Sequence, residues 1–227
     1  MRLRLGVLLL AGGTLACARV ELGRPPADPG AVPEVQVALT LDAREVRVGG
    51  GDALVVLEPD GRRVARIPAG TTVRLEAGPD GRIRLTPDGA APVMVELPVV
   101  APEDSGARLR VDGREVRGTV TVLVRPGGLA AVNRVGLEEY LAGVVNAEMG
   151  RRGTSEHAAL LSQAVVSRTV AYRAIGRARL RGYDLVATIS DQVYGGIAAE
   201  TEQGWNAVRA TRGEILTHDG VAIDAFF

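Results

Sequence analysis

The sequence predicts an α+β fold, with a hairpin-rich β region followed by a mixed catalytic-type domain that has two main helices. Three observations predict it. Apolar and polar residues alternate from Val35 onward, Asp-Gly turn dipeptides recur through the first half, and the apolar period becomes helical after Val124. With 227 residues, of which 46% are hydrophobic, the chain is long enough to bury a core in one or two domains.

Residues 1–17 have the pattern of a secretory signal. Arg2 and Arg4 precede a short apolar run, residues 5–16, that ends in small residues before Cys17. A positive start, an apolar stretch and a small residue at the cleavage point are the features of a signal peptide. The run is shorter than the roughly 20 apolar residues that a transmembrane helix needs. The sequence therefore predicts export to the cell envelope.

Cys17 is the only cysteine of the chain, so it cannot form half of an internal disulfide. Its position after Thr14-Leu15-Ala16 resembles a bacterial lipobox, although Thr14 stands where that motif usually has leucine. We expect lipidation at Cys17 and a membrane-anchored lipoprotein, in the periplasm or on the outer cell surface. Ordinary cleavage after Ala16 and an uncleaved anchor are the alternatives. All three place the folded part outside the cytoplasm.

The rest of the chain divides by composition into a linker, a β-rich module and a mixed domain. Residues 18–33 are rich in proline and glycine and are predicted to be a linker. Residues 34–105 are predicted to be the β-rich module, made of short hairpins. Its turns are predicted at four dipeptides: Asp60-Gly61, Asp80-Gly81, Asp88-Gly89 and Asp112-Gly113. The last of these already lies in the mixed domain, residues 106–227.

The charge balance excludes one class of partner. The chain has 27 basic and 27 acidic residues, so no summed field would attract it to a polyanion. We therefore expect no nucleic acid among its partners.

Two helices are predicted in the mixed domain. The first follows Gly136 and ends at Gly150, and its apolar stripe has helical offsets. The stripe consists of Leu137, Tyr140, Leu141, Val144 and Val145. A second helix is predicted from a cap at Thr154 or Ser155 to about Ile175, where Gly176 offers a stop. Strands are expected near residues 185–189, 214–217 and 221–227.

Glu148 is a carboxylate in a place where the stripe predicts an apolar residue, because it lies four residues after Val144 and seven after Leu141. If the stripe faces the interior, desolvation and the negative end of the helix dipole both favour the neutral acid. A neutral carboxylic acid can donate a proton to a glycosidic oxygen. If the helix frays before Glu148, the side chain simply turns to solvent.

Several motifs in one order resemble the sporulation stage II protein D (SpoIID)/LytB family. The resemblance covers roughly residues 106–227, and its most specific match is Ala147-Glu148-Met149. The other motifs are Arg114-Glu115-Val116-Arg117-Gly118, Asn133-Arg134-Val135, Leu137-Glu138-Glu139-Tyr140-Leu141, Gly143-Val144-Val145, Gln163-Ala164-Val165, Ser167-Arg168-Thr169, Ala171-Tyr172, Asp191-Gln192-Val193-Tyr194-Gly195-Gly196, Thr211-Arg212-Gly213-Glu214 and Ile223-Asp224-Ala225-Phe226. By the same resemblance the domain is expected to be incomplete at its C-terminus.

The resemblance implies a peptidoglycan lytic transglycosylase that acts in sporulation or division, with Glu148 as its catalytic acid and then base. Ordinary glycosidases need two carboxyl groups, whereas a lytic enzyme can use one. Arg168, Gln192 and Tyr194 are expected to bind and orient substrate. The expected partners are peptidoglycan glycan strands and other cell-wall hydrolases. A non-catalytic wall-binding protein or amidase enhancer is the alternative.

Other chemistries are less well supported. Asp191 and Glu200 remain open as a second carboxylate. Some family members carry histidine and cysteine near the Gln-Val-Tyr segment, where this chain has Ile189-Ser190-Asp191. The two histidines, His157 and His218, are far apart in sequence, so a zinc centre has too few ligands and no cofactor is expected.

Overall fold

The computed structural model describes residues 33–104, 106–150 and 152–225. The predicted signal, the lipobox-like Cys17 and residues 18–32 of the predicted linker lie outside the described residues. The α+β prediction is confirmed, because two larger sheets and a small hairpin combine with a helical part. None of the described helices is both long and apolar enough to cross a membrane.

The larger sheet has seven strands and joins segments from both ends of the described chain. Its spatial order is β13 (Leu185–Val186), β1 (Glu34–Ala43), β12 (Gly128–Gly136), β11 (Thr119–Arg125), β8 (Val99–Pro102), β3 (Leu54–Leu57) and β4 (Arg63–Ile67). β1 pairs antiparallel with β12 and parallel with β13, so it is an interior strand of this sheet. Strands from both sides of residue 105 therefore share one sheet.

The second sheet has six strands, and the predicted hairpins make up most of it. Its order is β10 (Arg114–Val116), β9 (Leu109–Val111), β2 (Glu45–Gly49), β5 (Thr72–Ala77), β6 (Ile83–Pro87) and β7 (Val93–Val95). The four Asp-Gly dipeptides lie where predicted, between the antiparallel neighbours β3/β4, β5/β6, β6/β7 and β9/β10. Asp112 and Gly113 both have positive φ, 48° and 89°, as a tight hairpin turn requires.

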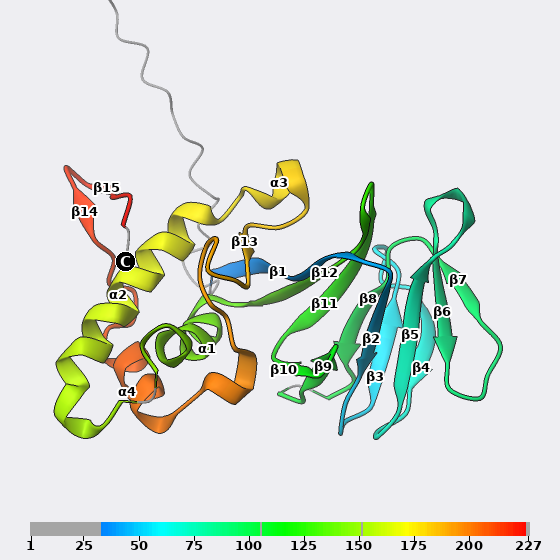
Figure 1. The fold of residues 1–227 in the computed structure, drawn as a ribbon, viewed down its shortest axis with the longest axis horizontal. Helices are drawn as coiled ribbons and strands as arrows, with labels where there is room; N and C mark the ends of the chain where they lie inside the picture. The colour runs from blue at the N-terminus through cyan, green and yellow to red at the C-terminus, as the bar shows by residue number, and fades with distance from the viewer. Residues whose placement is uncertain (1–32, 105, 151, 226–227) are drawn as a thin grey trace, which may run out of the picture. The chain divides into compact units, whose positions relative to one another are not determined.

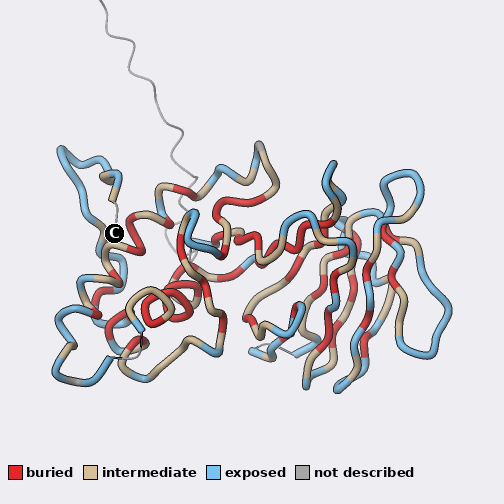
Figure 2. The backbone as a smooth tube through the Cα atoms, in the orientation of Figure 1, coloured by how far each residue is buried: buried red, intermediate tan, exposed pale blue. Residues whose placement is uncertain are grey.

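The core is built from every second residue of these strands, because alternate side chains point to opposite faces of the sheet. Val46 and Val48 of β2 are fully buried, whereas Arg47 between them is exposed. The same pattern holds in β5 and β6, so one face of the six-stranded sheet is buried and the other is open. Figure 2 shows the buried positions concentrated on the inner strands and on α1.

The helices gather at one end of the described fold (Figure 1). They are α1 (Leu137–Met149), α2 (His157–Ala174), α3 (Ala178–Arg181) and α4 (Glu202–Ala210), with short 3-10 turns at Pro79–Gly81, Thr154–Glu156 and Gly196–Ala199. The two predicted helices are α1 and α2. The predicted strands near the C-terminus are shorter than expected, with β14 (Thr217–His218) and β15 (Val221–Ala222) forming only a small exposed hairpin.

The apolar stripe of α1 is its buried face, as predicted. Tyr140, Leu141, Val144 and Val145 are all fully buried. Helix α1 follows β12 without a connecting loop and continues to Met149 before Gly150, whose φ of 73° ends it. Glu148 is therefore in the last turn of a formed helix, so the fraying alternative does not apply.

Candidate active site

Glu148 is half-buried, and a backbone group from a distant segment orients its carboxylate. The N–H of Val193 donates a hydrogen bond of 2.5 Å to Oε1 of Glu148. Among the described residues, no hydrogen bond reaches the other carboxylate oxygen, Oε2. The side chain thus has one fixed oxygen and one oxygen free for proton exchange with a bound molecule.

The segment that carries Val193 is held by buried side chains on both sides of it. Gln192 is fully buried, accepts a hydrogen bond of 3.1 Å from the Tyr140 hydroxyl, and donates one of 3.4 Å to the carbonyl of Ser167. Tyr194 is 2% exposed, and its hydroxyl donates to Oδ1 of Asn133 at 3.2 Å. Gln192 and Tyr194 therefore anchor this segment, and the backbone between them contacts Glu148.

Gly143 explains how this segment can lie so close to α1. A Cβ at Gly143 would be 2.6 Å from Cε2 of Tyr194 and 3.1 Å from the carbonyl oxygen of Gly196. The N–H of Gly195 donates to the carbonyl of Gly143 at 3.0 Å, and the rings of Tyr140 and Tyr194 lie 5.0 Å apart. A glycine inside the helix is needed here because any side chain would push the segment away from Glu148.

The two tyrosines are neutral hydrogen-bond donors in this site. Burial raises the pKa of Tyr140 well above its ordinary value, and the negative charges of Asp191 and Glu148 raise it further. Burial likewise raises the pKa of Tyr194, with a further contribution from Glu200. Both phenols therefore keep their protons at neutral pH. Tyr140 can then donate to Gln192, and Tyr194 can donate to Asn133.

Arg168 lies in the interior, where its guanidinium joins helices. It is 1% exposed, and its Nε and Nη2 donate to the two carboxylate oxygens of Glu138 at 2.9 and 2.8 Å. Nη2 also donates to the carbonyl of Val208, and Nη1 donates to Oγ1 of Thr211 and the carbonyl of Glu214. All five N–H groups of the guanidinium are thus used within the protein.

The expectation that Arg168, Gln192 and Tyr194 bind substrate stays a prediction, and in this structure the three side chains have a positioning role. All three side chains are at most 2% exposed, and their polar groups are bonded to protein atoms. They position the segment and the helices around Glu148, and none of them reaches an open surface.

The two other candidate carboxylates are also engaged. Asp191 accepts a hydrogen bond of 2.8 Å from the N–H of Val186. Both carboxylate oxygens of Glu200 accept hydrogen bonds from Arg117, at 2.9 and 2.8 Å, and one of them also accepts from Nε1 of Trp205. Both carboxylates thus have structural partners, and Glu148 is the one that lies in the last turn of α1 with Oε2 free.

Comparison with known families matches this part of the chain. A family model named SpoIID, described as stage II sporulation protein, matches residues 125–218. The predicted SpoIID resemblance is confirmed for this segment. The SpoIID family is associated with cell-wall remodelling in sporulation. No curated protein and no solved structure matched the chain.

The SpoIID segment contains Glu148, Val193 and the residues that anchor the Val193 segment, whereas Arg117, the partner of Glu200, lies before it. It begins at the end of β11, includes β12 and all four helices, and ends in β14. All six strands of the second sheet lie outside it. Within the described residues, no group of three or more His, Cys, Asp or Glu side chains comes together in a way that could hold a metal ion.

Sequence reasoning missed three contributors to the arrangement around Glu148. Asn133 is a fully buried amide on β12 that accepts from Tyr194 and donates to the carbonyls of Arg117 and Thr119. Gly143 admits the Tyr194 ring, and Val193 acts through its backbone. The first two had a signal, since an asparagine within an apolar strand and a glycine within an apolar helix both interrupt their pattern. A backbone donor has no such signal.

Proposed function

We propose that this protein is a lytic transglycosylase that cleaves the glycan strands of peptidoglycan, with Glu148 as its acid and base. The observation that carries the proposal is the orientation of Glu148 by the Val193 N–H in the SpoIID segment, with Oε2 left free. A general acid has to lie within hydrogen-bond reach of the oxygen that it protonates. A half-buried carboxyl at a helix end, fixed on one side only, fits that requirement.

The proposed reaction needs one carboxyl group and no water. The protonated Glu148 donates its proton to the bridging oxygen, and the bond between that oxygen and the anomeric carbon breaks. The carboxylate then takes the proton of the same sugar's 6-hydroxyl, whose oxygen attacks the anomeric carbon to close a 1,6-anhydro ring. Glu148 is again protonated at the end, so the cycle balances. This single-acid cycle agrees with the engagement of Asp191 and Glu200 by other groups.

The test is a comparison of the parent chain with Glu148→Gln on purified glycan strands, read by mass spectrometry of the released ends. The amide is nearly isosteric, so the fold should be kept, while release of 1,6-anhydro ends should fall by about 100-fold or more. Glu156→Gln is the matched control, because Glu156 is a nearby partly exposed carboxylate in an ion pair with Arg152. Parent-level release by Glu148→Gln would remove the catalytic assignment.

A second candidate function is wall binding or amidase enhancement without catalysis. One observation favours it: Arg168, Gln192 and Tyr194 are at most 2% exposed and offer no side-chain contact to a sugar. The same experiment separates the candidates. A parent chain that binds strands but releases no new ends would support the second candidate and exclude the first.

The proposed substrate lies outside the cytoplasm, which agrees with the predicted signal peptide. We propose that the protein is exported and anchored to the membrane by a lipid on Cys17, so that the folded part works in the cell envelope. Metabolic labelling of cells with a clickable fatty acid tests this anchor. Labelling should be lost in Cys17→Ser, and unchanged labelling of that variant would contradict the lipoprotein proposal.

A further inference from the structure

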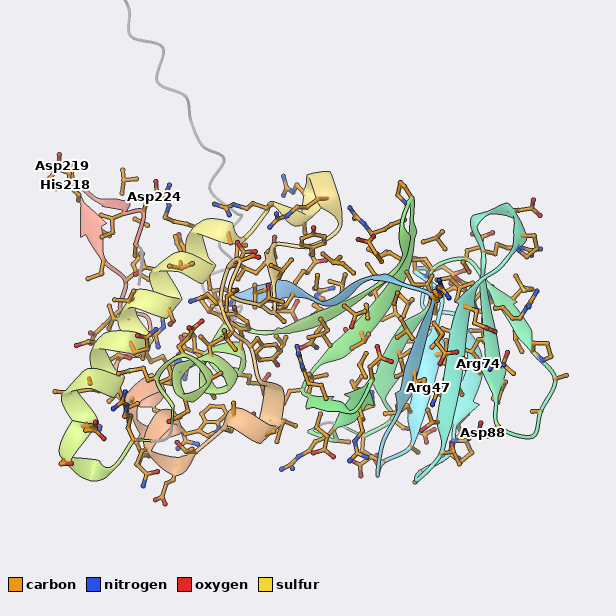
Figure 3. All side chains as sticks on the ribbon, viewed as in Figure 1. Arg47, Arg74, Asp88, His218, Asp219 and Asp224 are labelled. Atoms are coloured by element: carbon orange, nitrogen blue, oxygen red, sulfur yellow. The ribbon has the colours of Figure 1, made fainter. Side chains whose placement is uncertain are left out.

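The outward face of the six-stranded sheet carries a pocket of about 720 Å³, outside the SpoIID segment. Its size is within the range of about 300–1,000 Å³ that is usual for small-molecule sites. The pocket is lined mainly by charged and hydroxyl side chains from β2, β5, β6 and the β9–β10 turn. Figure 3 shows Arg47, Arg74 and Asp88 gathered on this part of the sheet.

The strand register builds the pocket as two rows of residues across the sheet. In one row, Gly49 of β2 lies opposite Thr72 of β5 on one side and opposite Arg110 of β9 on the other. In the next row, Arg74 of β5 lies between Arg47 and Thr86. Because residues two apart on a strand share a face, both rows point outward.

Gly49 lies at the centre of these rows and lines the pocket with main chain alone. A Cβ built there would be 2.2 Å from the carbonyl oxygen of Thr71, so the backbone before β5 already packs against this position. The flanking side chains of Thr72 and Arg110 are exposed and rise around this bare backbone. The floor of the pocket is therefore main chain, and its walls are polar.

Two arginines of the pocket occupy a pair of positions that is normally unfavourable for like charges in a β-sheet. Arg47 and Arg74 are directly opposite each other, and like charges at such positions destabilise a sheet. Arg47 pairs with Glu45 at 2.8 Å, and Arg74 pairs with Glu76 at 3.5 Å. Arg110 pairs in the same way with Glu115, at 2.7 Å.

These ion pairs do not close the pocket to an anion. All six side chains are at least 33% exposed, and pairs of this kind contribute only about 0–1 kcal/mol. Glu45 lies opposite Glu76, so the first two glutamates form a row of their own beside the arginine row. A ligand carboxylate in the pocket can therefore replace the glutamates as the partner of the arginines.

We propose that this pocket binds a carboxylate of the peptidoglycan stem peptide. The identity of the polymer rests on the proposed function, whereas the preference for a carboxylate rests on the pocket. Arginine presents a planar fork that matches a carboxylate with two parallel hydrogen bonds. Thr72 and Thr86 add hydroxyl groups, and Asp88 at the rim can accept from an amino or amide group of the same peptide. Asp112 is already used, because it accepts the N–H of Arg47.

The test is calorimetric titration of the full chain with a synthetic stem tetrapeptide, and with the same peptide after amidation of every carboxyl group. The free acid should bind, and the amidated peptide should bind at least about tenfold more weakly. Arg47→Ala combined with Arg74→Ala should weaken binding of the acid by a similar factor. The free peptide contains no glycosidic bond, so this result does not depend on whether Glu148 cleaves strands.

Arg84→Ala is the matched control. Arg84 is an exposed arginine on the same face of β6, opposite Glu76, and it is not part of the pocket lining. Its removal should leave the affinity unchanged. Equal binding of the amidated peptide, or an equal loss in Arg84→Ala, would overturn the proposal. Displacement of the peptide by inorganic phosphate at a lower concentration than acetate would also overturn it, in favour of a phosphate site.

Discussion

Glu138 and Arg168 connect α1 and α2 through a paired hydrogen bond in which each carboxylate oxygen accepts from a different guanidinium nitrogen, at 2.9 and 2.8 Å. The guanidinium is 1% exposed and Glu138 is 19% exposed. The other three donors of Arg168 bind groups at the end of α4 and in the turn after it. One side chain thus fixes three helices in the SpoIID segment.

Arg168→Ala should therefore lower the free energy of unfolding. Removing Arg168 from its buried ion pair leaves the charge of Glu138 and two carbonyls without partners, at a cost of about 3–5 kcal/mol. Denaturant unfolding followed by circular dichroism measures this cost. Arg168→Lys keeps the charge but loses the fork, so it should recover only part of the stability.

Arg134→Ala is the control for the loss of an arginine ion pair. Arg134 binds Glu34, but its side chain is 61% exposed and that of its partner is 47% exposed. The free energy of unfolding of Arg134→Ala should differ from that of the parent by no more than about 1 kcal/mol. If Arg168→Ala were as stable as Arg134→Ala and only raised KM, the expected substrate-binding role of Arg168 would be supported over the structural one.

The two main helices, α1 and α2, and the place of Glu148 could be predicted because their signals are local. The α1 stripe repeats at helical spacing, and glycines mark both of its ends, so Glu148 falls on the last turn. Helix α4 was not predicted, although Thr201 caps it by accepting from the N–H of Gly204. Its short segment has few apolar residues, and Ala207 and Val208 alone do not make a stripe.

The roles of the buried polar residues could not be predicted because their partners are distant in sequence. Arg168 meets Glu138 and Val208, which lie 30 and 40 residues away. Tyr194 meets Asn133 across 61 residues. Tyr194 lies beside two glycines in the sequence, and in the structure its side chain packs into the interior. Periodicity carries no information about such pairs.

Alkaline pH should unfold the protein through the buried phenols of Tyr140 and Tyr194. Burial raises the pKa of Tyr140 and of Tyr194 above the ordinary value of about 10. The folded state therefore keeps these protons to a higher pH than the unfolded chain does. Their contribution to stability is complete below about pH 10 and is lost as the pH rises further toward the folded-state pKa values.

Tyrosinate absorbance and near-ultraviolet circular dichroism, recorded together during an alkaline titration, test this. The phenols that ionise last should do so over the same pH range in which the dichroism signal is lost. The chain has four tyrosines. Ionisation of all four while the native signal persists would contradict the prediction.

Gly143→Ala should separate stability from activity at the Glu148 site. The added Cβ would lie 2.6 Å from the Tyr194 ring, and that ring cannot easily retreat, because its hydroxyl is bonded to Asn133 and it packs on Tyr140. Overpacking of this kind costs about 1–3 kcal/mol. Replacing glycine by alanine inside a helix stabilises the helix by up to about 1 kcal/mol. The net loss of stability should therefore be small.

The activity of Gly143→Ala should fall much more than its stability. Relief of the clash requires the Tyr194 segment to move outward, which draws the Val193 N–H away from Glu148. A misplacement of about 1 Å can cost on the order of 100-fold in rate. Gly153→Ala is the control, because its φ is −82° and the nearest atom to a new Cβ is 3.9 Å away. Release of 1,6-anhydro ends should drop at least about tenfold in Gly143→Ala and stay at the parent level in Gly153→Ala. If Gly143→Ala cleaved strands at the parent rate, the contact between Val193 and Glu148 would have no part in catalysis.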